Sequence, residues 1–181
     1  MVNLTATLST PITANHILHY HEIVDAYSHV SVRNPNNNQT FFLSGSLAPA
    51  LVSSPEDLIE YYVENASSVD PNAGRGYVER YIHSEILKRF PTMNSVVHSH
   101  SENVIPYTIA GVALQPSYHM AGFLGGLSNS ILQRATLAYT RTGEEVPLFD
   151  IAQYYNESDR HDMLVRNTRQ GAALASYFSS P

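Results

Sequence analysis

Residues 77–101 require a helix and a strand in close succession, because the sequence there changes from one backbone periodicity to another. Large apolar residues recur every four positions in 77–90, which predicts a helix that Pro91 must end. These residues are Val78, Ile82, Ile86 and Phe90. Residues 94–101 are rich in β-branched side chains and alternate, which predicts a strand. The rest of the fold must accommodate this helix–strand pair.

The same pair carries the densest group of reactive side chains in the sequence. Glu79 and His83 are four positions apart, so on a helix they lie one turn from each other on one face. His98 and His100 are two positions apart, so on a strand they project side by side. His-x-His on a strand suits one metal ion with two nitrogen ligands, but an isolated pair also fits two half-buried structural histidines.

A β-hairpin is predicted upstream of this pair. His29–Arg33 alternates as a strand, residues 34–38 read NPNNN and favour a turn, and Thr40–Ser44 forms the returning strand. Before the hairpin, residues 15–27 have apolar side chains at helical spacing, which predicts an amphipathic helix with Thr13 as its cap. Its apolar positions are Ile17, Tyr20, Ile23, Val24 and Tyr27, and its histidines, His16, His19 and His21, are predicted to be surface residues.

The segments that follow are mainly structural. Residues 54–57 begin a helical turn, and residues 58–63 continue it or form a strand. Residues 65–76 form a loop that contains Arg75, which is either a surface residue or a contact for an anionic substrate. Residues 105–114 are predicted as buried helix turning into strand, and one or two helices within 159–178 complete the chain.

The composition excludes several classes of protein. The 181 residues suit one globular domain, with 43% hydrophobic and 14% charged residues. Ten basic against sixteen acidic residues give a net charge of −6, so neither nucleic acid nor an anionic membrane is predicted as a partner. The absence of cysteine excludes disulfides and thiolate catalysis. The N-terminus does not resemble a signal peptide, which favours a cytoplasmic location.

Several motifs together resemble the class II aldolase/adducin family. They are E-x-x-x-H, a helix ending in Phe-Pro, N-S-V-V-H-S-H-S and H-M-A-G-F-L-G, together with HVSVRNP, FFLSGSLAPALV, VPLFDI and DMLVRN. Within the family the chain looks most like the branch with decarboxylases of dihydroxylated aromatic acids. The resemblance implies a single α/β domain over residues 1–181, built as a three-layer α/β/α sandwich around a mainly antiparallel sheet. It also implies homo-oligomers, usually tetramers.

The resemblance also implies a site. A divalent metal ion, zinc with manganese or iron as alternatives, would be held by His98 and His100, and Glu79 would move the proton. The aldolases of the family bind a substrate phosphate at positions that correspond here to Ser28, His29, Ser44 and Tyr77. A histidine and an aromatic ring suit a planar carboxylic acid better, although the serines also fit a role in satisfying the hairpin backbone.

The chain departs from the family pattern in two places. Residues 125–145 separate motifs that are almost adjacent in relatives, so this segment is predicted to be an insertion, either a surface excursion or sequence foreign to the fold. The resemblance implies a third metal-binding histidine in a Gly-His-Gly segment beyond the C-terminal helix. Within this chain the candidates for that place are His119 and, less well positioned in a polar run, His161. The chain as given is therefore expected to be C-terminally truncated, with weak metal binding and poor activity.

These features predict a divalent-metal-dependent lyase, a decarboxylase or aldolase, that cleaves a C–C bond of a small hydroxylated or keto carboxylic acid. One alternative is a non-catalytic, adducin-like module or a decayed enzyme, which a measurement of bound metal would distinguish. Another is a metal-dependent oxygenase, because histidine clusters also bind Fe(II), although Glu79 is the only carboxylate evident near the His-x-His pair. Turnover without oxygen would exclude the oxygenase.

Overall fold

The computed structural model describes residues 3–114 and 146–178. These residues fall into two compact units. The first unit combines Met1–Ser101 with Phe149–Pro181, and the second is Glu102–Leu148. No helix among the described residues is long and apolar enough to span a membrane.

The predicted domain organisation stays a prediction. The two compact units neither establish nor exclude a single domain over residues 1–181. The whole of the predicted insertion at 125–145, and the candidate ligand His119, lie outside the described residues.

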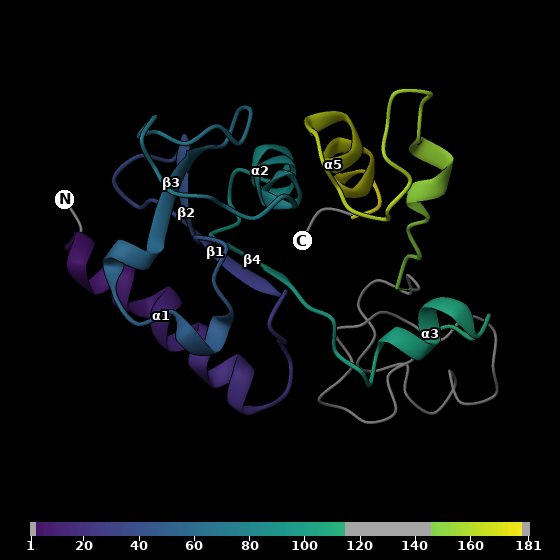
Figure 1. Ribbon diagram of the computed structural model, residues 1–181, viewed down its shortest axis with the longest axis horizontal. Coiled ribbons are helices and arrows are strands. Elements are labelled where there is room, and N and C mark those ends of the chain that lie inside the picture. Colours follow the sequence, from purple (N-terminus) through teal and green to yellow (C-terminus); the bar gives the residue numbers. More distant parts are fainter. Residues whose placement is uncertain (1–2, 115–145, 179–181) are drawn as a thin grey trace. The chain divides into compact units, whose positions relative to one another are not determined.

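A four-stranded antiparallel sheet lies at the centre of the first unit (Figure 1). Its spatial order is β3 (Leu58–Tyr62), β2 (Thr40–Ser44), β1 (His29–Arg33) and β4 (Ser95–His98). The predicted hairpin is confirmed with both strands at their predicted bounds. Residues 58–63, for which helix and strand were both open, form a strand after a short 3₁₀ helix, η2 (Pro55–Asp57), which confirms the predicted helical turn.

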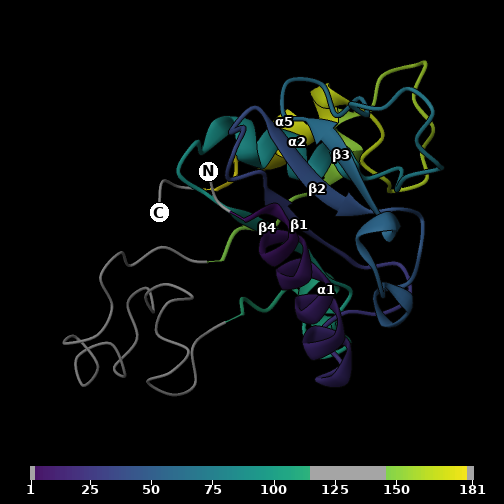
Figure 2. The same ribbon diagram turned by 90° about the vertical axis from the view of Figure 1, so that its left-hand side faces the viewer.

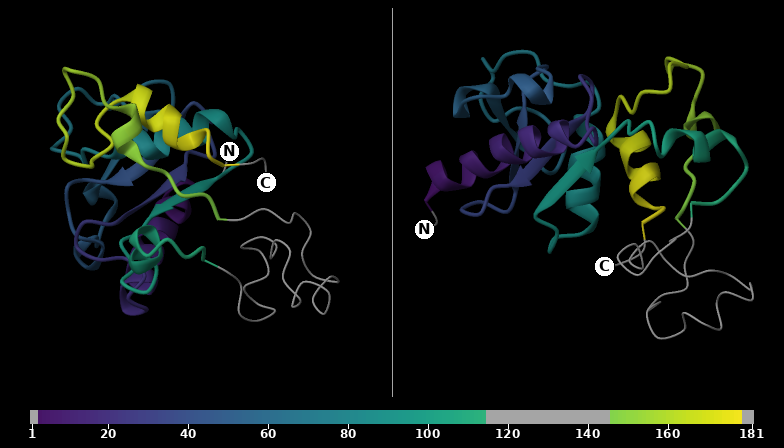
Figure 3. Two further views of the ribbon diagram at one scale, coloured as in Figure 1. Left: turned by 90° about the vertical axis from the view of Figure 1, so that its right-hand side faces the viewer. Right: turned by 90° about the horizontal axis from the view of Figure 1, so that it is seen from below.

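Helices cover the two faces of this sheet. Helix α1 (Leu4–Tyr20) contacts β1, helix α2 (Arg80–Arg89) contacts β4, and α5 (Thr168–Ala175) packs against α2. Figures 1 and 2 show α1 and α2 on opposite sides of the sheet, and Figure 3 shows α5 over the outer side of α2. The predicted three-layer α/β/α architecture around an antiparallel sheet is confirmed.

The main core lies between the sheet and α2. Phe41 and Leu43 are fully buried on the face of β2 that turns toward this helix. Ile82 and Ile86 of α2 pack against them, as the four-residue spacing predicts, and Leu87 joins them. Each large aliphatic side chain buried in this way stabilises the fold by about 1.5–3 kcal/mol.

The predicted N-terminal helix over 15–27 is wrong in its bounds. α1 covers Leu4–Tyr20, so Thr13 lies inside the helix and does not cap it. The helix ends because Glu22 adopts a left-handed backbone conformation, with φ of 56°, and the N–H of Ile23 returns to the carbonyl of Leu18 at 2.9 Å.

The predicted apolar face of this helix is also wrong. Ile17 and Tyr20 are 53% and 81% exposed, whereas Pro11 and Asn15 are buried. The Asn15 amide donates to the carbonyl of Pro11 at 2.8 Å, so this polar side chain is partly satisfied on the buried side. The three histidines of the segment are exposed, as predicted.

Two other elements differ from the prediction, while the C-terminal part of the chain agrees with it, since one or two helices were expected within 159–178. Helix α2 begins at Arg80, three residues later than predicted, because Tyr77 and Val78 remain in the preceding loop. In the second unit, residues 105–114 contain only α3 (Ile105–Ile109), and the described residues there are largely exposed, with no strand. The helical pattern over 159–178 forms α5 alone, preceded by loop, because Asn167 caps the N–H of Gln170 and starts the helix there.

Arg33 fastens the end of β1 to the end of α2. Its guanidinium is buried and donates to four backbone carbonyls, at distances of 2.7–3.3 Å: Leu87, Phe90, Met93 and Asn38. Two of these carbonyls belong to the last turn of α2, where unpaired carbonyls and the helix dipole favour a cation. Arg33 thereby ties the end of α2 and the residues before β4 to the end of β1.

We expect Arg33→Met to lower the free energy of unfolding by about 3 kcal/mol or more, because it leaves several buried carbonyls without a donor. The measurement is urea unfolding followed by circular dichroism. Arg160→Met, at an exposed position, is the matched control and should change the stability by no more than about 0.5 kcal/mol. Equal effects of the two substitutions would contradict the assigned role of Arg33.

Candidate functional site

His98 and His100 lie at the point where β4 ends. A strand was predicted over residues 94–101, but β4 stops at His98, so His100 lies just beyond the strand. The two rings still meet. Their Nε2 atoms are 2.8 Å apart and the ring planes are nearly perpendicular, at 89°. Two unprotonated imidazole nitrogens repel at this separation unless a proton or a cation lies between them. At 2.8 Å the pair has the length of an N–H···N hydrogen bond. In a tetrahedral zinc site, nitrogens about 2.1 Å from the ion are roughly 3.4 Å apart, so the two rings would have to separate by about 0.6 Å to share one ion.

Glu79 lies beside this pair, at the N-terminal end of α2. Its Oε2 is 3.5 Å from His98 Nε2, and its Oε1 accepts the N–H of Val165 at 3.1 Å. Burial raises the pKa of the Glu79 carboxyl above its ordinary value, and this effect outweighs the Val165 hydrogen bond. The side chain thus combines partial burial, a histidine neighbour and a carboxyl group that holds its proton more tightly than usual.

The C-terminal segment reaches Glu79 because α5 packs closely on α2. Gly171 of α5 makes this approach possible, since a Cβ atom there would lie 2.5 Å from the backbone oxygen of Tyr81. Val165, just before α5, is buried in the core and presents its N–H to the carboxylate. Residues far apart in sequence therefore meet at the start of α2.

His29 completes the group from the neighbouring strand. The sheet register places His29 directly opposite His98, and the two rings stack 4.7 Å apart at 22°. Tyr77 packs against the His29 ring with centroids 4.4 Å apart and donates its hydroxyl to the carbonyl of Leu47 at 2.5 Å. His29 is fully buried, and its Nε2 atom has no hydrogen-bond partner among the described residues.

Two sets of residues in this group fit a metal ion. His29, Glu79 and His98 each offer one ligand atom, and these atoms lie within 4.8 Å of one another. The rings of His29 and His98 are nearly parallel, however, and a metal binds in the plane of each imidazole, so their lone pairs do not converge well. The perpendicular rings of His98 and His100 converge better. A pair of imidazoles with the Glu79 carboxylate nearby is a donor set that suits zinc, manganese or iron.

Asp25 supports His100 from a turn that the sequence analysis missed. Its Oδ2 is 3.2 Å from His100 Nδ1, and its Oδ1 accepts from the hydroxyl of Ser28 at 2.7 Å and from the N–H groups of Tyr27 and Ser28. Burial acts to raise the pKa of Asp25, but these hydrogen bonds outweigh it and lower the pKa to about 2. The available signal was Asp-x-x-Ser before a strand, a common pattern for side-chain-to-backbone turns.

His83 lies deeper than its spacing from Glu79 suggests. It is fully buried against β1, where its Nε2 is 2.6 Å from His29 Nδ1 and its Nδ1 is 2.7 Å from Ser31 Oγ. Burial lowers the pKa of both histidines, that of His83 to about 3, so both are neutral near pH 7. A buried chain of polar groups therefore runs from inside the fold to the site.

The remaining predicted site residues are more peripheral. The Ser44 hydroxyl is buried, and Arg75 is exposed. His161 is exposed and stacks on Tyr155, with ring centroids 4.5 Å apart. Their predicted roles stay predictions.

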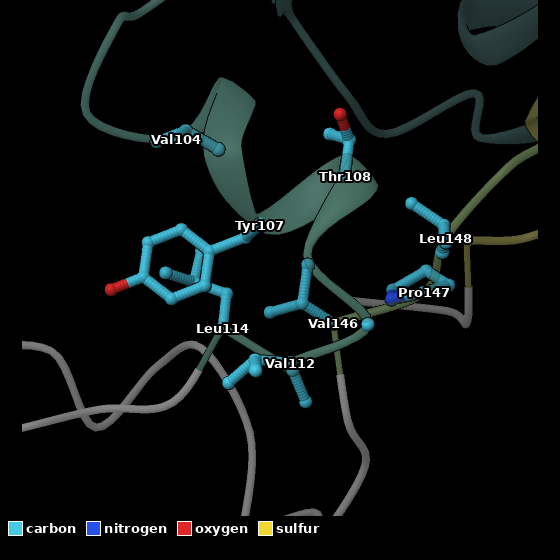
Figure 4. A pocket seen from close by; sticks show the side chains of 10 residues that line it. Val104, Tyr107, Thr108, Val112, Leu114, Val146, Pro147 and Leu148 are labelled. Carbon is cyan, nitrogen blue, oxygen red and sulfur yellow. The ribbon is translucent and has the colours of Figure 1, made fainter.

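The second unit has a hollow of a different kind. It has a volume of about 460 Å³ and lies between α3 and residues 146–148 (Figure 4). Val104, Tyr107, Val112 and Leu148 are among its lining residues, which include no acid, base or histidine. The described residues that line this hollow do not supply the groups that acid–base or metal chemistry requires.

Comparison with known proteins identifies the family. The sequence profile of the class II aldolase and adducin N-terminal domain matches residues 11–168, so the chain belongs to this family, as the motifs predict. A curated relative, decarboxylase tropJ of Talaromyces stipitatus, is 48% identical over 182 residues. The match covers 99% of this chain but 62% of the relative, so the chain spans less than two thirds of that protein.

Solved structures show the same fold at low identity. An L-fuculose 1-phosphate aldolase from Glaciozyma antarctica matches with a TM-score of 0.57 and 21% identity, over 75% of this chain and 57% of the aldolase. YgbL from Escherichia coli matches with a TM-score of 0.60 and 14% identity, over 95% of this chain and 70% of YgbL. At these identities the likeness shows the fold alone.

We expect the buried histidines to make stability depend on pH. The pKa of His83 is about 3 in the folded protein and near 6.5 in the unfolded chain, so between these values the unfolded state binds more protons. The free energy of unfolding should therefore fall as the pH drops below about 6.5, by up to about 1.4 kcal/mol per pH unit for each such histidine.

The measurement is urea unfolding with a chelator from pH 7 to pH 4. His83→Phe keeps a ring but cannot titrate, so its slope against pH should be shallower by about one proton. Identical slopes for the two proteins would show that His83 does not contribute to the dependence.

Proposed function

We propose that this chain carries the site of a divalent-metal-dependent carbon–carbon lyase that decarboxylates a small hydroxylated carboxylic acid. The observation that carries the proposal is the meeting of three groups: the convergent Nε2 atoms of His98 and His100, the Glu79 carboxyl 3.5 Å from His98, and the buried His29 ring. Family membership and the 48% identity to a decarboxylase support it. The cytoplasmic location and the tetramer implied by the resemblance stay predictions.

His98 and His100 are the proposed metal ligands, with zinc as the first choice and manganese or iron as alternatives. When bound, the ion supplies Lewis acidity that favours a build-up of negative charge on a substrate oxygen. Asp25 accepts the Nδ1 proton of His100, which leaves the Nε2 lone pair free for the ion.

Glu79 is the proposed proton carrier. Its raised pKa allows the carboxyl group to hold a proton closer to neutral pH than an exposed glutamate does. In a decarboxylation, the bond between the carboxyl carbon and its neighbour breaks, CO₂ leaves, and the electron pair stays on the neighbouring carbon. Glu79 gives its proton to that carbon and takes one back from water.

His29 and Tyr77 are the proposed substrate contacts. The buried imidazole can hydrogen-bond a carboxylate, and the adjacent tyrosine ring suits a planar acid. The buried Ser44 hydroxyl, for which Tyr77 is the one side-chain partner among the described residues, is able to join them. The hydroxyl of Ser28 donates to Asp25 and accepts the N–H of His100, so we assign Ser28 to holding the turn rather than the substrate.

We expect Glu79→Gln to retain zinc while losing at least a hundredfold in decarboxylation of 2,3-dihydroxybenzoate, because a proton carrier is lost and the ligands stay. His98→Ala and His100→Ala should lose both zinc and turnover. Metal content by mass spectrometry and carbon dioxide release are the two measurements. Loss of zinc in Glu79→Gln would make Glu79 a ligand, and a wild-type chain that binds no divalent ion would favour a non-catalytic module.

Asp25→Asn should weaken zinc binding by roughly 10–100-fold, because the carboxylate that orients His100 is replaced by a neutral amide. Isothermal titration with zinc measures the effect. Asp70→Asn, in an exposed loop, is the matched control and should bind zinc like the unchanged protein. If Asp25→Asn also bound zinc normally, the contact between Asp25 and His100 would have no role in the site.

A further inference from the structure

The proposed chemistry does not use His83 or Ser31, although both are fully buried next to the site. Ser31 lies on β1 two residues after His29, and His83 lies in the middle of α2. Together they form a chain of two short contacts, Ser31 Oγ to His83 Nδ1 at 2.7 Å and His83 Nε2 to His29 Nδ1 at 2.6 Å. The other nitrogen of the His29 ring, Nε2, is buried and has no hydrogen-bond partner within the part of the chain that the structure describes.

The positions of the hydrogen atoms in this series of contacts can be inferred by asking which buried groups each arrangement would leave without a partner. In one direction Ser31 donates its hydroxyl proton to His83 Nδ1, His83 Nε2–H donates to His29 Nδ1, and His29 carries its proton on Nε2. In the other direction His29 Nδ1–H donates to His83, and His83 Nδ1–H donates to Ser31. Among the described residues the Ser31 hydroxyl proton then has no acceptor, and the His29 Nε2 lone pair is also unpaired.

The first direction therefore leaves one buried group unpaired, whereas the second leaves two. An unpaired buried polar group costs about 1–3 kcal/mol, which favours the first tautomer by roughly 5-fold to 160-fold. The one group left over in the first direction is the Nε2–H of His29, close to Glu79 and His98. This N–H group can form a hydrogen bond only when a ligand with an acceptor atom binds beside it.

We propose that His83 and Ser31 are positioning residues that hold His29 as the tautomer with its proton on Nε2, so that the site presents a fixed donor to an acidic ligand's carboxylate. The carboxylate as the ligand group rests on the proposed function, while the tautomer of His29 does not. A hydrogen bond from a buried neutral donor to a carboxylate is strong, because the acceptor is charged. A ring that is fixed in advance also avoids the cost of choosing a tautomer when the ligand binds.

The direct test is nitrogen-15 NMR of the zinc-loaded protein, in which the ring-nitrogen shifts separate protonated from unprotonated nitrogens. The signals of His29 are assigned by their loss in His29→Gln. We expect a protonated Nε2 and an unprotonated Nδ1 in the unchanged protein, and a mixture of tautomers in Ser31→Ala. A protonated Nδ1 with an unprotonated Nε2 in the unchanged protein would overturn the proposal.

The second test measures binding of 2,3-dihydroxybenzoate to the zinc-loaded protein. His83→Phe preserves a ring but removes the donor to His29, so the dissociation constant should rise roughly tenfold. His83→Gln offers an amide N–H near the position of Nε2 and should restore most of this loss, while zinc affinity stays the same in both variants. Equal weakening by His83→Phe and His83→Gln would mean that His83 acts by packing, and would overturn the proposal.

The decarboxylase activity and the tautomer of His29 can be tested independently. A protein that shows His29 protonated on Nε2 but releases no carbon dioxide from any hydroxybenzoate would contradict the proposed function and leave the tautomer assignment intact. A protein that decarboxylates the acid but carries the His29 proton on Nδ1 would contradict the tautomer assignment alone.

Discussion

Polar groups buried between strand β1 and helix α2 hold the fold and the site in one arrangement. Buried donors and acceptors must find partners, and here each end of β1 finds them on or beside α2. Arg33 reaches the carbonyls that end the helix, while His29 and Ser31 meet His83 in its middle. The apolar contacts of Phe41 and Leu43 with α2 supply most of the stabilising burial, but they are less directional. The polar contacts are directional, so they favour the alignment of strand and helix in which Arg33 and His83 find their partners.

That alignment determines which side chains reach the site. The register of β1 and β4 places His29 opposite His98, and a slip of one residue would turn one of the two rings to the other face of the sheet. The end of β4 after His98 frees His100 to turn its ring edge toward its neighbour, and Asp25 holds it there. Glu79 enters from the start of α2, and the Val165 N–H fixes its carboxylate. The proposed metal ligands, the proton carrier and the substrate contact thus come from separate elements that share β1 and α2 as their frame.

The sequence was informative where periodicity and turn chemistry were strong. Alternation over His29–Arg33 and Thr40–Ser44, with Asn and Pro between them, fixed the hairpin, and the spacing of His98 and His100 predicted their meeting. It failed for α1, because nothing in residues 15–27 signals that Glu22 turns left-handed or that Asn15 is buried. It also missed Asp25 and the partnership of His29 with His83. Contacts between residues 54 positions apart depend on tertiary packing, which local patterns do not encode.

The central claim is that His98 and His100 hold a divalent ion while His29 stands beside it as a donor to the substrate. X-ray absorption at the zinc edge tests this claim directly, because it counts the imidazole ligands of the bound ion. The account predicts two or more imidazoles in the unchanged protein and the same number in His29→Gln. A loss of one imidazole in His29→Gln would make His29 a metal ligand and would contradict the account, as would a zinc ion bound by oxygen alone.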